Sequence, residues 1–141
     1  MRAMTGAGLA MAGVVLGVAL GAFAAEPMQS TPLLTSTTTW SGQPLALPQG
    51  PVEVRAAHVV MPVGTALTPH QHPDPRDVYI ESGLLSVSNE VTGVTREFGP
   101  GSFVVEAIGQ WHTGKVVGDA PVVLVVIDQA PPGASNVVPK P

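Results

Sequence analysis

Short β-rich stretches, separated by glycine and proline, follow one another from residue 52 to residue 128. They are rich in Val, Ile, Thr, Phe and Tyr, which are enriched in strands, and outside residues 1–24 none has a convincing period of 3.6 residues. The stretches are VEVRAAHVVM, DVYIES, LLSVSN, GVTREF, SFVVEA, HTGKVV and PVVLVVID. Seven or eight short strands at this spacing predict an all-β antiparallel sandwich or barrel over residues 52–130.

Three segments lie outside this pattern. Residues 1–24 contain Arg2, then an uncharged apolar run, then the small residues Ala22 and Ala24, which together predict a secretory signal peptide that is cleaved after Ala24. The alternative is a membrane anchor, although the apolar run is at the short limit of the roughly 17–25 residues that span a bilayer. Residues 25–51 are rich in Thr, Ser, Pro and Gln and predict an extended arm, laid over the domain or partly disordered. The proline-rich residues 131–141 predict a flexible tail without regular structure.

Length and charge narrow the classes of function. The chain has 141 residues, enough for one domain. Its net charge is −4, and removal of Arg2 with the signal peptide leaves 5 − 10 = −5. Because the chain has no basic patch or Lys/Arg run, nucleic-acid binding is not expected. The chain has no cysteine, so stability must come from the core, from oligomer contacts or from a metal. Cleavage of the predicted signal peptide would leave a periplasmic or secreted protein without a stable membrane anchor.

Two of the four histidines, His70 and His72, are one residue apart in TPHQHPDPRD. On a strand, residues two apart point to the same face, so the two imidazoles would offer adjacent positions to a transition metal. His112, in GQWHTG, is the best candidate for a third ligand. The alternative for His70 and His72 is a pair of solvated surface side chains. His58, in AAHVV, has no such partner and is expected to be an ordinary core or surface histidine.

The combined spacing of glycine and histidine resembles two motifs of the cupin superfamily. The first motif runs glycine, five residues, His-x-His, three or four residues, glutamate, six residues and glycine, and the second runs glycine, five residues, proline, any residue, glycine, two residues, histidine, three residues and asparagine. The matching positions are Gly64, His70, His72 and Gly83 for the first motif, and Gly101, Gly109 and His112 for the second. This resemblance extends over about residues 45–130. It implies a single jelly-roll β-barrel of the cupin type, with a metal site inside and pairing into a homodimer.

The chain departs from these motifs at the carboxylate ligand. Arg76 stands where the family has its glutamate, and Asp77 follows one residue later. The fourth ligand therefore remains open among Asp77, Glu106 and water. Glu106 precedes His112 in FVVEAIGQWH, and in the site it would act as ligand, as catalytic base or as hydrogen-bond partner of a metal-bound histidine. The alternative for Glu106 is a solvated carboxylate on an edge strand.

The resemblance assigns His70, His72 and His112 to a divalent transition metal, and Mn, Fe, Ni, Cu and Zn are all compatible with nitrogen ligands. The first hypothesis is a metal-dependent enzyme of the dioxygenase, decarboxylase or isomerase type, acting on a small organic molecule. The second is a barrel that binds a sugar, an organic acid or a metal without catalysis, which the missing glutamate favours. The third is a purely structural barrel. Because one barrel hosts many reactions, the sequence alone does not choose the metal or the substrate.

Overall fold

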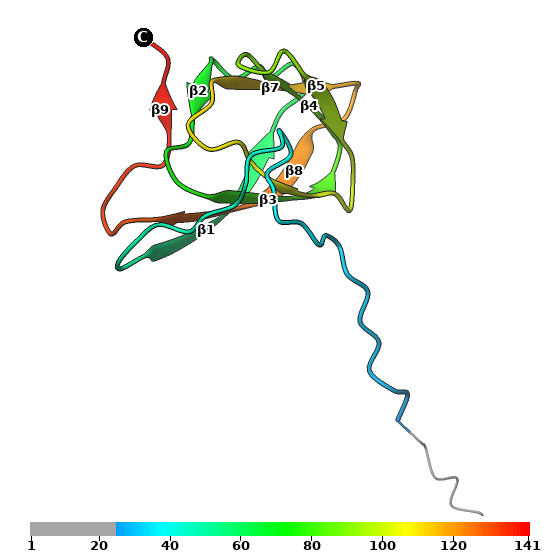
Figure 1. Cartoon of the computed structure of the whole chain (residues 1–141). Helices are drawn as coiled ribbons and strands as arrows, with labels where there is room; N and C mark the ends of the chain where they lie inside the picture. Colours follow the sequence, from blue (N-terminus) through cyan, green and yellow to red (C-terminus); the bar gives the residue numbers. More distant parts are fainter. Residues whose placement is uncertain (1–24) are drawn as a thin grey trace, which may run out of the picture. The chain divides into compact units, whose positions relative to one another are not determined.

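Nine β-strands make up the regular structure of the described part of the chain, residues 25–141, in a computed structural model (Figure 1). They are β1 (Glu53–Met61), β2 (His70–Gln71), β3 (Arg76–Ser82), β4 (Leu84–Asn89), β5 (Thr95–Phe98), β6 (Phe103–Val105), β7 (His112–Val117), β8 (Val122–Ala130) and β9 (Val138–Pro139). Residues 31–141 form one compact unit, to which the following description applies. The predicted signal peptide, residues 1–24, lies outside the described residues. Residues 25–141 contain no helix with the length and hydropathy needed to cross a membrane.

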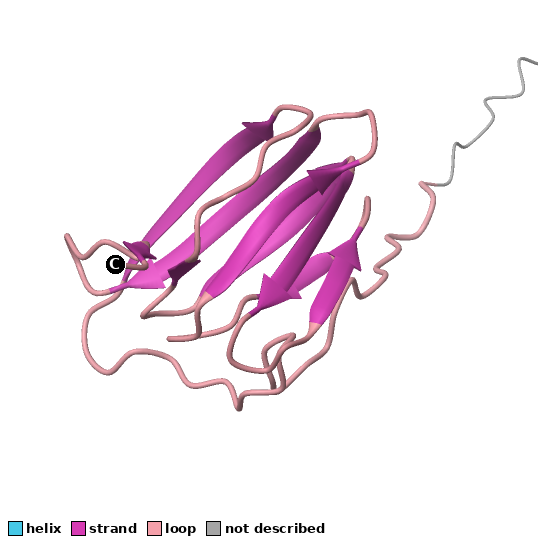
Figure 2. Ribbon diagram, turned by 90° about the horizontal axis from the view of Figure 1, so that it is seen from above, coloured by secondary structure: helices cyan, strands magenta, loops and turns pink. Residues whose placement is uncertain are grey.

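The strands form two sheets that face each other. One sheet has the order β1-β8-β3-β6 and the other has the order β5-β4-β7-β2-β9, and these are the lower and upper layers in Figure 1. All pairings between these strands are antiparallel. The view from above in Figure 2 shows the strands joined by loops. The prediction of an all-β antiparallel jelly-roll barrel is therefore confirmed.

Gly83 allows the chain to pass from one sheet to the other between β3 and β4. Its φ is +79°, and a Cβ at this position would lie 2.4 Å from the backbone oxygen of Pro121. Both features require glycine, because an L residue is strained at this φ and the backbone of Pro121 has no flexible end that can move away. The sequence identified Gly83 as the turn glycine, and the close approach to Pro121 explains why the turn needs it.

The alternation of side chains along β3 sets which residues face the interior. Val78 and Ile80 are buried, with 3% and 0% exposure, and they pack with Leu85 of β4 and Leu124 of β8 in one core cluster. Burial of each such side chain stabilises the fold by roughly 1.5–3 kcal/mol. Because alternate residues of a strand share a face, Arg76 also faces the interior and Asp77 faces outward.

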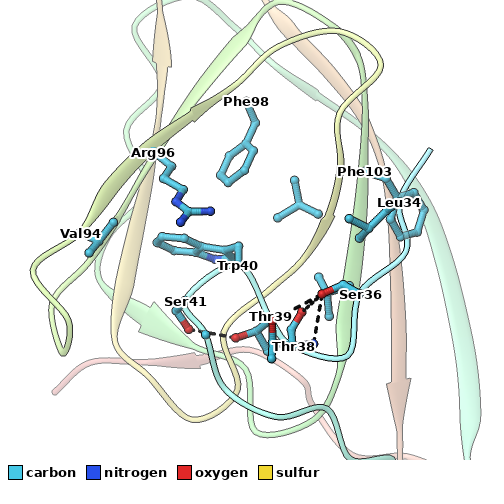
Figure 3. A pocket seen from close by; sticks show the side chains of 13 residues that line it. Leu34, Ser36, Thr38, Thr39, Trp40, Ser41, Val94, Arg96, Phe98 and Phe103 are labelled. Carbon is cyan, nitrogen blue, oxygen red and sulfur yellow. Dashed lines mark hydrogen bonds between the residues drawn. The ribbon is translucent and has the colours of Figure 1, made fainter. Parts of the chain in front are cut away.

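The segment before β1 packs against the barrel beside β5 and β6. Trp40 is buried and belongs to the core cluster, and its amide donates a hydrogen bond to the carbonyl oxygen of Val105 on β6. Its ring lies edge-on to Phe98 of β5, with 6.0 Å between ring centroids. Figure 3 shows Trp40 in the groove that is bordered by Phe98 on one side and Phe103 on the other. This segment therefore supplies a core side chain to the barrel.

The end of the chain differs from the sequence-based expectation. Residues 131–141 were expected to lack regular structure, but Val138 and Pro139 form β9, which pairs with the His-x-His strand β2 through His70↔Pro139 and Gln71↔Val138. Proline content alone pointed to a loop, and it did so incorrectly because Pro139 lies in an edge strand, where a missing amide hydrogen is tolerated. The tail consequently lies next to two of the predicted metal ligands.

Candidate metal centre

Three histidines, from β2, from the residue after it and from β7, converge inside the barrel. His70 of β2 is paired with His112, the first residue of β7, and His72 follows β2 directly. The backbone of His72 is held by a hydrogen bond from the amide of Gly109 to its carbonyl oxygen, 2.8 Å long. One potential ligand atom from each imidazole lies within 4.8 Å of the other two, and among the described residues this is the group of three that could hold a metal ion.

A backbone carbonyl orients each of the three rings. Nδ1 of His70 lies 2.8 Å from the backbone oxygen of Thr68. Nδ1 of His72 lies 2.6 Å from that of Asn136, and Nδ1 of His112 lies 2.8 Å from that of Gln110. A carbonyl oxygen only accepts hydrogen bonds, so each Nδ1 must carry the proton. In the neutral imidazoles, Nε2 then keeps its lone pair, which is the form that binds a metal.

Glu106 brings a carboxylate to the same place. Its amide donates to the carbonyl oxygen of Arg76, which anchors the residue just after β6. The Oε2 atom lies 2.8 Å from Nε2 of His72 and 3.2 Å from Nε2 of His112. These contacts are close, but Nε2 of both histidines is buried without a hydrogen bond of acceptable geometry. Buried polar atoms are rarely left in this condition, and a metal between the three groups would satisfy them.

The carboxylate and the imidazoles shift one another's protonation. Burial raises the pKa of Glu106, but the neighbouring His112 and His72 outweigh it and hold that pKa far below its usual range. Burial lowers the pKa of His112, but Glu106 outweighs it, so the pKa of His112 is raised. Burial lowers the pKa of His70. Glu106 is therefore anionic at neutral pH, as a metal ligand or a base has to be.

The three histidines and Glu106 line a small cavity of about 160 Å³. Most of its lining is aliphatic, from strands of both sheets, and the polar lining residues are the three histidines, Glu106 and Arg76. The guanidinium of Arg76 forms a two-pronged ion pair with Asp128, at 2.7 Å from Nε to Oδ1 and 2.9 Å from Nη2 to Oδ2. A cavity of this size and composition suits a small molecule with an oxygen-bearing end and an apolar remainder.

Two other sequence candidates lie away from this group. Asp77 faces outward from β3, where its carboxylate accepts a hydrogen bond from Gln129 at 3.0 Å and burial raises its pKa. It was one of the alternatives for the fourth ligand, and its position outside the cavity leaves Glu106 and water. His58, which the sequence left as a core or a surface histidine, lies on β1 with an exposed side chain, 3.0 Å from Glu81.

Sequence reasoning assigned no role to three residues that shape the centre. Arg76 was noted only as a missing glutamate, but it has the same parity as the buried Val78 and Ile80, and this pattern was available in the sequence. Asp128 and Asn136 were not considered. Asp128 is 52 positions from Arg76, and Asn136 is 64 positions from His72, so no local pattern indicates these contacts.

The residues present fit a transition metal. Three imidazole nitrogens with fixed tautomers and one anionic carboxylate form the mixed nitrogen and oxygen set that Mn, Fe, Ni, Cu and Zn accept. Nε2 of His72 and of His112 contacts only Oε2 of Glu106, without good hydrogen-bond geometry, and a metal ion bound by all three groups would satisfy these atoms. The three-histidine group could therefore bind a metal ion, and the identity of the ion remains a prediction.

Comparison with known proteins agrees with this architecture. The family model described as "Cupin domain" matches residues 57–128, which is more than half of the chain. This chain belongs to the cupin family. The family match includes all three histidines and Glu106 of the candidate centre, and the cupin resemblance predicted from the motif spacing is confirmed. A search of curated proteins finds no match.

Several solved structures share the cupin fold. DMSP lyase DddQ from Ruegeria pomeroyi is 26% identical with a TM-score of 0.54, over 62% of this chain and 43% of its own. The oxalate decarboxylase of Lactobacillus farciminis, solved as a formate complex, is 23% identical with a TM-score of 0.52, over 61% of this chain and 26% of its own. An uncharacterised Klebsiella pneumoniae protein with a double-stranded β-helix domain is 20% identical with a TM-score of 0.52, over 62% of this chain and 75% of its own. The chain thus spans less than half the length of the two enzymes.

Proposed function

We propose that this protein is a metal-binding cupin that acts as a metal-dependent enzyme on a small organic molecule. The observation that carries the proposal is that each of the three Nδ1 atoms lies against a backbone carbonyl, so that the Nε2 atoms of His70, His72 and His112 are all available as ligands. Glu106 serves as the fourth ligand or as the base. The bound ion would supply Lewis-acid or redox activation of a coordinated oxygen.

The residues around the ion supply the rest of the chemistry. Glu106 is anionic and mostly buried, so it can accept a proton from a molecule bound in the cavity. Arg76 places a guanidinium at the cavity wall, where it can orient an anionic oxygen, and the aliphatic walls exclude water. These features suit decarboxylation, dioxygenation or isomerisation of a small oxygen-bearing substrate. The cupin neighbours include an oxalate decarboxylase and a DMSP lyase, and a Bacillus subtilis oxalate decarboxylase has Mn(II) centres, which supports Mn among the candidate ions.

The first test is the metal content of the purified protein, measured by mass spectrometry beside a His70→Ala/His72→Ala double variant. His58→Ala is the matched control, because it removes a histidine outside the cavity. We expect about one metal per chain in the wild type and in the control, and none in the double variant. Equal metal content in all three proteins, or none in the wild type after loading at neutral pH, would refute the proposal.

A second candidate function is ligand binding without turnover. It is favoured by Arg76, which stands where the motif has its glutamate and is neutralised by Asp128 rather than by a substrate. Oxygen-uptake and decarboxylation screens with metal-loaded protein separate the two functions. Ligand binding that requires His70 and His72 but yields no product would support the second.

We also propose that the protein is exported. The support is the uncharged apolar run before Ala22 and Ala24, which is typical of a cleaved signal peptide. Expression of the full chain, followed by mass measurement of the periplasmic protein, tests this: the expected N-terminus is Ala25. Retention of the whole chain in the membrane fraction would support an anchor.

A homodimer is the third part of this proposal. The outer face of the four-stranded sheet carries an apolar row, in which Val125, Tyr79 and Phe103 are aligned across β8, β3 and β6. On the neighbouring edge strand β1, Val54 and Val60 are 64% and 56% exposed. Exposed apolar faces of this kind mark interfaces between chains. Light scattering should give a dimer, and a Val54→Lys/Val60→Lys variant should give a folded monomer; a monomeric wild type would exclude the dimer.

A further inference from the structure

The C-terminal tail returns to the metal centre after β8. Beyond β8, a turn is closed by a hydrogen bond from the amide of Ala134 to the carbonyl oxygen of Pro131, and β9 then pairs with β2. The amide of Lys140 donates to the carbonyl oxygen of Pro69, the residue before His70, at 2.9 Å. The tail is thus attached to the strand that contains His70 and is followed directly by His72.

Asn136 is the residue of this tail that lies deepest, with 3% exposure. Its backbone oxygen is the acceptor for Nδ1 of His72 at 2.6 Å. Its side chain is bound on both ends: Oδ1 accepts from the amide of Asp74 at 2.9 Å, and Nδ2 donates to Oδ1 of Asp128 at 2.7 Å. A buried side chain with both ends bound holds its own backbone in one position.

The three histidines differ in how their rings are oriented. His70 and His112 donate to the carbonyl oxygens of Thr68 and Gln110. Each of these acceptors lies two residues before its histidine in the chain. The carbonyl that accepts from His72 comes from a residue 64 positions away. His72 therefore depends on the tail for its orientation, whereas the other two rings are oriented locally.

Asn136 also contacts the ion pair at the cavity wall. The atom that it donates to, Oδ1 of Asp128, is the one that accepts from Nε of Arg76. Asn136 thus supplies the carbonyl oxygen that accepts from His72, and its side chain binds the carboxylate that pairs with Arg76. Arg76 and His72 lie in the lining of the same cavity, so displacement of Asn136 would disturb two of its polar groups together.

We infer that Asn136 is a positioning residue of the metal centre and that the segment Asn136–Lys140 is a strap that completes the centre. The strap fixes the Nδ1-protonated tautomer of His72 and, through Asp128, the direction of the Arg76 guanidinium. The inference rests on the proposed function where metal affinity is the readout, but the orientation of His72 is measurable without a metal. Loss of a group that orients a metal-bound histidine lowers metal affinity by about 10–100-fold.

The test compares the wild type with Asn136→Ala, using the full chain and Co²⁺ as the probe. Ser135→Ala is the matched control, because Ser135 is the neighbouring exposed residue and its hydroxyl donates within the tail to Val137. We expect the dissociation constant for Co²⁺, from its visible absorption bands, to rise about 10–100-fold in Asn136→Ala and to stay within about twofold in the control. The absorption spectrum of the saturated variant should also change, which a purely structural role would not produce.

Nitrogen-resolved NMR of the metal-free wild type supplies a measurement that needs no variant. The imidazole proton of His72 should reside on Nδ1, exchange slowly, and show nuclear Overhauser contacts to protons of Asn136 or Val137. If Nδ1 carries no proton, or if its proton exchanges freely, the inference is overturned. It is also overturned if Asn136→Ala binds Co²⁺ with unchanged affinity and spectrum. If the wild type binds no Co²⁺ but the Nδ1 proton shows the tail contacts, the strap is supported and the proposed metal function fails.

Discussion

Glu106→Gln tests the electrostatic pairing at the centre of the barrel in the metal-free protein. The carboxylate lies 2.8 Å and 3.2 Å from the Nε2 atoms of His72 and His112. The depressed pKa of Glu106 contributes stability that is present above its ordinary value of 4.5 and is lost as the pH falls through the folded value. The raised pKa of His112 contributes stability that is present below its ordinary value of 6.5 and is lost as the pH rises through the folded value. Both contributions are therefore present between these two values.

The magnitude follows from the charged partner that His112 loses. Because the pKa of His112 is raised, its imidazole is protonated in the folded wild type at pH 5 and lies 3.2 Å from the carboxylate of Glu106. A hydrogen bond between charged groups contributes roughly 1.5–3 kcal/mol, so its loss at pH 5 should cost about 2 kcal/mol. As the pH rises through the folded pKa of His112, the proton leaves and this contribution falls. The variant should thus be less stable than the wild type mainly at acidic pH.

Urea unfolding with a chelator present, at pH 5 and at pH 8.5, measures this difference. Glu97→Gln is the control, because Glu97 is an exposed carboxylate on β5. The expected result is a loss of about 2 kcal/mol for Glu106→Gln at pH 5, a small change at pH 8.5, and none for the control. Equal destabilisation at both pH values would mean that the side chain acts through packing, and the pairing argument would then be wrong.

Three further outcomes are expected. Gly83→Ala should destabilise the protein by more than about 2 kcal/mol, because the added Cβ meets Pro121 in addition to the cost of the left-handed conformation. The control Gly93→Ala, at a φ of +70° with no atom within 4 Å, should cost only about 1–2 kcal/mol. Equal losses of the two variants in urea titrations would contradict this. Ile80→Ala should cost about 2–5 kcal/mol, since Ile80 is 0% exposed, and a loss below about 1 kcal/mol in the same assay would mean that the core is not packed as described. A metal ion at 100 times its dissociation constant should stabilise the wild type by about 2.7 kcal/mol in thermal unfolding. The same concentration should leave the stability of His112→Ala unchanged. Equal stabilisation of both proteins would mean that the ion binds elsewhere.

Several features of this protein were accessible from the sequence because they depend on local patterns. Alternating and continuous apolar stretches between glycine and proline predicted the strands, since a strand with one buried face needs that alternation. The spacing of Gly64, His70, His72, Gly83, Gly101, Gly109 and His112 indicated the cupin family, which the family match confirmed. Arg76 in place of the glutamate was visible as well.

The tertiary structure decided which side chains complete the centre. The sequence left the fourth ligand open among Asp77, Glu106 and water, with Glu106 as the candidate base. The parity of β3 directs Asp77 outward, and the segment after β6 brings Glu106 to His72 and His112. Asn136 comes to His72 across 64 positions of the chain, and no local pattern encodes such a contact. Strand periodicity depends on neighbouring residues, whereas a ligand set depends on how distant strands are brought together, and only the folded chain determines that arrangement.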